Sequence, residues 1–331
     1  MMQRLTLPVL FKEFAVQMRG SRAAILIGVY VGLAIIATRL LYGLVTAELD
    51  RGAPLLAAQV GQVIFIGLTL GLQALMIFLA PATTVNAISG EYERGTHSLL
   101  LTTPVTPFQL VVGKLVAALA FLLVLLIAAL PVYGIVLLFG GVEVADLLRV
   151  MAMLLVTAVT GCVFGLFCSA VTRQTYSATL LCYALLVSLV GGTLFAANVW
   201  SLVNSMRAAP PWLVAANPLS AMAAALVPAR PPASSFTGGL RPLVLISLLT
   251  GGSLNGGGEA TLLFHRATAV IYGGVTLLFL WATLHLVTPL RRWRLTLVDA
   301  ALLLVLLGYL VLAYGLRSWW LTALLGIMPI G

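Results

Sequence analysis

The chain has 331 residues, of which 62% are apolar and only 8% are charged. A soluble globular domain is roughly 45–50% apolar and about 25% charged, so the few charges here could not cover a water-soluble fold of this size. The composition therefore excludes a soluble protein and predicts one that lies in a lipid bilayer.

The net charge of +9 does not indicate a nucleic-acid partner, because the basic residues are not gathered in one patch. They lie between apolar runs, which is the distribution that orients helices in a membrane. The clearest examples are Arg4, Lys12, Arg19 and Arg22 before the first run, Arg173 between two later runs, and Arg291, Arg292 and Arg294 after another.

Residues 1–22 are predicted to form an amphipathic helix on the cytoplasmic side of the membrane. One face repeats apolar residues at helical spacing, while Lys12 and Arg19 lie elsewhere around the helix. That face consists of Leu7, Phe11, Phe14 and Met18. A helix of this kind lies in the headgroup layer. It is either an anchor that only fixes topology or a lever that couples the first span to a cytoplasmic partner.

Six apolar segments follow that are long enough to cross the bilayer, since a spanning helix needs about 20 residues. They cover about 23–46, 60–85, 109–139, 148–171, 176–197 and 268–289. We therefore predict an all-α polytopic membrane protein with a six-span domain over residues 23–290. A further apolar segment at about 295–316 predicts one or two additional membrane helices within residues 291–331.

The middles of these spans carry almost no charge, and Arg39 in the first span is the main exception. An arginine at a helix centre costs about 2.5–3.5 kcal/mol on insertion scales, and less near an edge. Arg39 has either a structural role or a contact with substrate. In the fourth span, Gly161 and Gly165 form a GxxxG pattern, which brings helices close together. The pattern indicates either internal packing or a dimer seam.

With the basic N-terminus in the cytoplasm, the loop 86–108 is cytoplasmic and the stretch 198–267 lies outside. The outer stretch contains apolar pieces too short for confident spans, such as 212–227. We predict short helices there that lie at the outer interface or dip into it. Asn217 and Pro218 favour one helix start, with Asn as the cap and Pro in the first turn.

The loop between the second and third spans is the densest polar segment of the chain. It reads ISGEYERGTHSLLLTTPVTPFQLVVGK from Ile88 to Lys114. Gly95 permits a sharp turn, and the Thr106-Pro107 pair is typical of a helix start. These features predict a short rigid structure that leaves the membrane and carries charges at its tip. Such a structure is suited to docking against another protein.

This loop resembles the signature loop of a known family, the integral-membrane permease subunits of ABC-2-type ABC transporters. The similar residues are Glu91-Tyr92-Glu93-Arg94-Gly95-Thr96, then Leu99-Leu100-Leu101-Thr102-Thr103-Pro104-Val105, then Gly113-Lys114. The resemblance covers roughly residues 8–290. It implies that residues around 90–105 fit a cleft on a separate cytoplasmic ATPase. It also implies a path formed with a second copy or a sister permease, a location in the inner cell membrane, and export.

The resemblance assigns ATPase coupling to Glu91, Glu93, Arg94, Gly95, Thr96, Leu99, Leu100 and Pro104. In the N-terminal helix the residues that it implicates are Phe11, Lys12, Phe14, Met18 and Arg19.

The sequence contains no GxxxxGK[ST] phosphate loop, so we expect ATP to bind in the partner subunit. We predict no catalytic residue, cofactor or metal site in this chain. Two alternatives stay open, an ion-coupled secondary transporter and a scaffold subunit that does not transport. The bare middles of the spans weaken the first, because ion-coupled transporters carry ionisable groups there.

Overall fold

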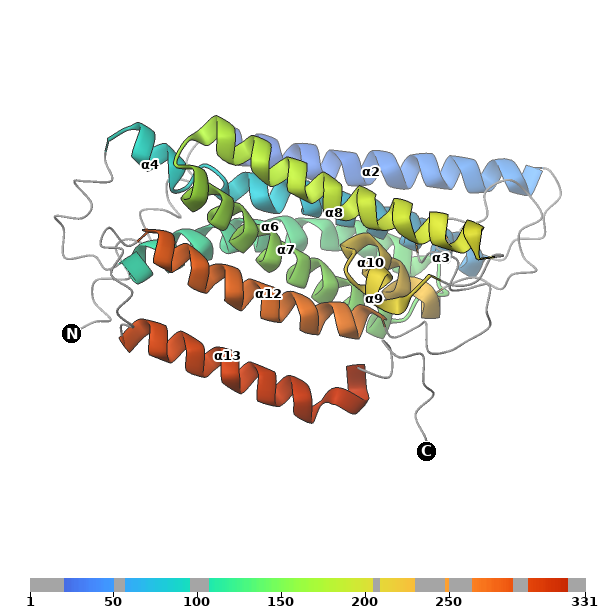
Figure 1. The fold of residues 1–331 in the computed structure, drawn as a ribbon. Coiled ribbons are helices and arrows are strands. Elements are labelled where there is room, and N and C mark those ends of the chain that lie inside the picture. The colour runs from blue at the N-terminus through green and yellow to red at the C-terminus, as the bar shows by residue number, and fades with distance from the viewer. Residues whose placement is uncertain are drawn as a thin grey trace.

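The computed structural model describes residues 21–50, 57–95, 107–204, 209–229, 248–249, 264–287 and 297–320. Throughout this described part the chain is helical or forms turns, without strands. The long helices run along a common direction and form an elongated bundle (Figure 1). They are α2 (Ser21–Asp50), α3 (Ala57–Thr84), α6 (Pro107–Leu138), α7 (Val144–Thr172), α8 (Thr175–Val203), α12 (Phe264–Val287) and α13 (Leu297–Gly315). The short elements are α4 (Ser89–Glu93), α9 (Pro211–Ala215), α10 (Pro218–Leu226) and the 3-10 turn η1 (Val227–Ala229).

Six of these helices, α2, α3, α6, α7, α8 and α12, are long and apolar enough to cross a membrane. They coincide with the six spans expected from the sequence, and the all-α polytopic fold is confirmed. The seventh apolar segment forms α13, which packs beside α12 at the edge of the bundle (Figure 1). The Tyr309 hydroxyl of α13 donates a hydrogen bond to the Val270 carbonyl of α12.

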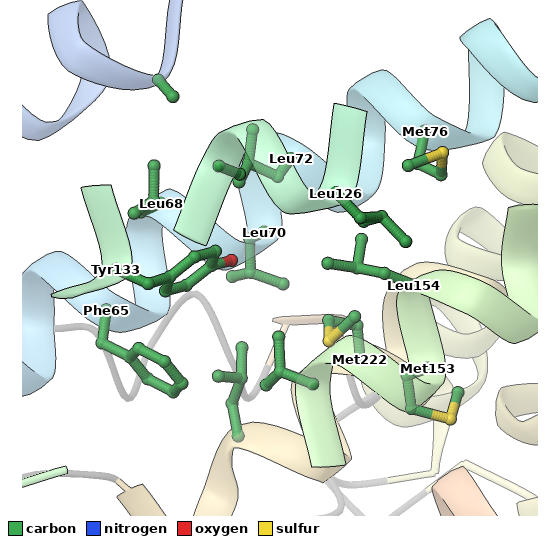
Figure 2. Packing of buried hydrophobic residues seen from close by; sticks show 14 of the residues in the cluster. Phe65, Leu68, Leu70, Leu72, Met76, Leu126, Tyr133, Met153, Leu154 and Met222 are labelled. Atoms are coloured by element: carbon green, nitrogen blue, oxygen red, sulfur yellow. The ribbon is translucent and has the colours of Figure 1, made fainter. Parts of the chain in front are cut away.

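Helix α3 lies at the centre of the bundle and contributes many of the buried apolar side chains. Figure 2 labels some of them, in one cluster with residues from α6, α7 and α10. The labelled side chains are Phe65, Leu68, Leu70, Leu72 and Met76 of α3, Leu126 and Tyr133 of α6, Met153 and Leu154 of α7, and Met222 of α10. In the apolar 18-residue stretch of α3, 67% of the residues are buried, compared with 11% in the corresponding stretch of α2 and 17% in that of α8. Helices α2 and α8 therefore have few fully buried residues in the single chain.

The GxxxG pattern of α7 serves internal packing in this structure. A methyl group added at Gly161 would lie 2.9 Å from the Ala80 Cβ atom, and one at Gly165 would lie 2.8 Å from the Pro81 carbonyl oxygen. These distances are too short for a real Cβ atom, so only glycine allows α7 to approach α3 this closely. Of the two interpretations of the pattern, the structure thus supports packing within the chain.

Helices α9 and α10 form a hairpin that enters the bundle from the end opposite α4 (Figure 1). The helix start predicted at Asn217 and Pro218 is confirmed, because the Asn217 side chain accepts hydrogen bonds from the backbone N–H groups of Leu219 and Ser220. Helix α10 lies inside the bundle, since every residue from Ser220 to Leu226 is buried. A buried hairpin of this kind needs hydrogen-bond partners for the backbone groups at its turn.

Candidate functional site

The polar loop that follows α3 begins with a short helix at one end of the bundle. The chain leaves α3 at Thr84, turns through residues 85–88 and forms α4. Figure 1 shows α4 beyond the ends of the neighbouring long helices. Gly95 then takes a positive φ of 66°, which glycine adopts without a steric penalty. The sharp turn predicted at Gly95 is confirmed.

Glu91 of α4 forms an ion pair with Lys114, which lies in the second turn of α6. The Lys114 Nζ atom is 2.6 Å from the Glu91 Oε1 atom, and the two side chains are only 8% and 18% exposed. A buried charge that loses its partner costs several kcal/mol, so this pair holds α4 against α6. Glu91 therefore faces the protein's own interior rather than the surface.

Glu93 connects α4 to the first residue of α8. Its Oε1 atom accepts a hydrogen bond of 2.7 Å from the Thr175 backbone N–H, and its Oε2 atom accepts one of 2.7 Å from the Thr175 hydroxyl. These two bonds tie the end of α4 to the start of α8. A negative charge at a helix N-terminus is also favoured by the helix dipole.

The last turn of α7 and the residue that follows it make further contacts with α4 and its N-terminus. The Ser169 hydroxyl oxygen accepts hydrogen bonds from the backbone N–H groups of Ile88 at 3.1 Å and Ser89 at 2.8 Å. The Arg173 guanidinium lies over the Tyr92 ring, 5.2 Å from its centroid, as in a cation–π contact. Together with Glu91 and Glu93, these residues attach α4 to α6, α7 and α8.

The structure divides the residues predicted for ATPase coupling into two groups. Glu91 and Glu93 bond to their own chain, whereas Arg94 and Gly95 are exposed at the end of α4. Thr96, Leu99, Leu100 and Pro104 lie outside the described residues, as does the N-terminal helix with Phe11, Lys12, Phe14, Met18 and Arg19. Arg39 is exposed on α2.

A second group of polar residues lies inside the bundle, where the sequence had suggested little beyond Arg39. The Gln73 amide of α3 donates hydrogen bonds to the Thr157 hydroxyl of α7 at 2.8 Å and to the Pro218 carbonyl at 3.2 Å. Thr268 and Tyr272 of α12 donate to the carbonyls of Ala215 and Ala216. These side chains satisfy the backbone of the α9–α10 turn.

Asn217, at the same turn, joins the hairpin to the middle of α8. Its Nδ2 group donates hydrogen bonds of 2.7 Å to the Val190 carbonyl and 2.7 Å to the Thr193 hydroxyl. The interpretation of the sequence missed this group because it considered only ionisable residues in the spans. Uncharged Gln, Asn, Thr and Tyr residues also need partners in an apolar interior, and that requirement was the available signal.

The described residues bring together no group of three or more His, Cys, Asp or Glu that could hold a metal ion. The arrangement is instead that of a multi-pass helical membrane protein with the short helix α4 at one end and a buried hairpin at the other. The chain belongs to the ABC-2 family of transporter proteins, whose family profile matches residues 8–321. That match continues past residue 290, where the resemblance was expected to end, and includes α13. A search of the curated proteins found no match.

Proposed function

We propose that this chain is the permease subunit of an ABC transporter and that a separate cytoplasmic ATPase docks on its 88–108 loop. The observation that carries the proposal is the way α4 is held. Contacts with α6, α7 and α8 fix its position, while Arg94 and Gly95 at its end stay exposed. A push on such an element is transmitted to the spans rather than absorbed by the loop.

In this proposal ATP binds to the partner, because the chain itself has no phosphate loop. ATP-driven closure of the partner subunits displaces the 88–108 loop and the N-terminal helix, and the spans then open the path to one side. The end of the bundle that carries α4 is cytoplasmic, in the inner cell membrane. The direction is export, which rests on the family resemblance.

The path forms between this chain and a second permease, either another copy or a sister subunit. The exposure of α2 and α8 supports this arrangement. In the apolar stretches of these helices, only 11% and 17% of the residues are buried in the single chain. Exposed side chains on both helices include large apolar residues along much of their length. Arg39 lies on one of these surfaces, where it either reaches the headgroups or contacts substrate in the path.

The docking is tested best at Arg94, because a change at Glu91 or Glu93 would also break contacts within the chain. We expect Arg94→Glu to reduce co-purification of the ATPase and its rate of ATP turnover, since it reverses the charge at the exposed end of α4. The matched control is Arg317→Glu, which makes the same charge change at an exposed residue after α13. Equal ATPase recovery and equal turnover in both variants would contradict docking at this site.

A further inference from the structure

We propose that α8 carries movement of the cytoplasmic loop to the buried α9–α10 hairpin, with Glu93 and Asn217 as the two positioning residues. The inference rests on the proposed function, because it assumes an ATPase that moves the loop. It adds which span is driven and which element receives the movement.

The first step is the attachment of α4 to the inner end of α8. Both carboxylate oxygens of Glu93 bond to Thr175, the first residue of α8. Charge-assisted bonds of this kind are shorter and stronger than neutral ones. The Tyr92–Arg173 contact lies beside them, on the residue that caps α7. A displacement of α4 therefore pulls directly on the N-terminus of α8.

The second step is the freedom of α8 to move. Its buried residues form one narrow stripe, and the other faces of the helix are exposed or half-buried. That stripe consists of Ala178, Cys182, Leu186, Ala197 and Ser201. By contrast, neighbouring helices enclose α3 and α7. In the apolar stretches of these two helices, 67% and 50% of the residues are buried. Because packed interiors resist deformation, α8 shifts relative to the rest of its own chain at a lower cost than α3 or α7 does, whether or not a second permease lies against its exposed faces.

The third step is the attachment of α8 to the hairpin. Asn217 caps α10 through its Oδ1 atom and at the same time donates to Val190 and Thr193 through Nδ2. One side chain thus links the start of α10 to α8 about halfway along that helix. A shift of α8 displaces the hairpin turn, whose backbone also bonds to α3 and α12. The hairpin is therefore the element that opens or closes the far end of the path.

The experiment follows the response of α8 to nucleotide in the complex with the co-purified ATPase, in nanodiscs. A nitroxide label is placed at Leu202→Cys, an exposed site near the far end of α8, in a background where the three native cysteines are alanine. A second label at Leu40→Cys, also an exposed site, reports on α2, whereas the two hydrogen bonds of Glu93 go to Thr175 of α8. Spectra are compared with and without Mg²⁺ and a non-hydrolysable ATP analogue.

We expect the α8 label to respond to the analogue, and Glu93→Ala to reduce that response at least about fivefold, a typical size for coupling between sites. The ATPase should still co-purify and the α2 label should still respond. Glu93→Asp should restore part of the response, and Asn217→Ala should leave the α8 response intact. Glu143→Ala is the matched control, because Glu143 also caps a helix, α7, but at the opposite end of the bundle.

The inference would be overturned if the spectrum of the α8 label did not change on addition of the ATP analogue. It would also be overturned if Glu93→Ala left the response of the α8 label unchanged. Loss of the ATPase in Glu93→Ala would assign Glu93 to docking, and equal loss of both label responses would assign it to general stability. Either result also overturns the inference. If no ATPase co-purifies with the otherwise unchanged chain, the proposed function fails instead.

Discussion

At the scale of single residues, Glu91 and Glu93 attach α4 to the bundle through Lys114 and Thr175. The sequence predicted the turn at Gly95 that the structure has. It did not reveal where Glu91 and Glu93 point. The partner of Glu93 is Thr175, 82 positions away, and only the packing of α7 and α8 beside α4 brings the two residues together. Lys114 offered a partial signal, since a lysine inside an apolar run requires an acidic partner.

The Glu91–Lys114 pair leads to a prediction about stability. Glu91→Gln leaves the Lys114 ammonium buried without its carboxylate, so we expect the free energy of unfolding to fall by up to about 3–5 kcal/mol. The double variant Glu91→Gln with Lys114→Met should lose less than the single variant, because no buried charge remains. Unfolding of the purified protein in detergent measures both effects.

The control for this prediction is Arg94→Ala, which removes an exposed charge from the same short segment. Surface charges contribute little to stability, so its unfolding transition should match that of the unchanged protein. A double variant that is less stable than Glu91→Gln would contradict a structural role for the pair.

At the scale of helices and turns, the sequence predicted which segments form spans better than it predicted which elements pack against each span. Long apolar runs located six spans and the seventh helix, and Asn217-Pro218 located the start of α10. The burial of α10 from Ser220 to Leu226 was not predictable, because the nine residues of this helix have the composition of a short interfacial helix as much as of a core helix. Its depth is set by bonds from Gln73, Thr268 and Tyr272, which lie on helices distant in the sequence.

The contact between α7 and α3 predicts that replacing a glycine by alanine has a very different effect on stability at this contact than elsewhere in the bundle. Gly165→Ala would place a Cβ atom against the Thr84 hydroxyl and 2.8 Å from the Pro81 carbonyl oxygen. Because backbone is the obstacle, the helices must separate, and we expect a loss of about 1–3 kcal/mol in the free energy of unfolding. Thermal unfolding in detergent checks the prediction.

The matched substitution is Gly134→Ala in α6, where an added Cβ atom would meet nothing within 4 Å. Replacing glycine within a helix by alanine is favourable by roughly 0.5–1 kcal/mol, so this variant should be unchanged or slightly more stable. If Gly165→Ala behaved in the same way, the close approach of α7 and α3 would be wrong.

At the scale of the whole molecule, the family and the fold agree on a helical, multi-pass membrane protein of the transporter class. Composition alone excluded a soluble protein, and the loop signature indicated the ABC-2 family that the profile match shows. The transported substrate has no comparable signal in the sequence, because the middles of the spans carry almost no charged groups that could recognise it. The apolar surfaces of α2 and α8 serve lipid contact and subunit contact equally well.

The proposed orientation predicts a labelling pattern in intact cells. Arg94→Cys at the end of α4 should react with a membrane-impermeant maleimide only after permeabilisation. Val144→Cys, an exposed residue at the start of α7, should react without it. The reverse pattern would place the 88–108 loop outside the cell, where no ATPase could dock.

Native mass spectrometry of the complex, extracted from the membranes of the cells that produce it, is the sharpest test of whether a separate ATPase binds this chain. We expect an assembly that contains a polypeptide that binds ATP and two permeases. The permeases are either two copies of this 34.9 kDa chain or one copy together with a sister permease. A chain that is recovered alone, and that moves solute against a gradient in vesicles without nucleotide, would contradict this expectation.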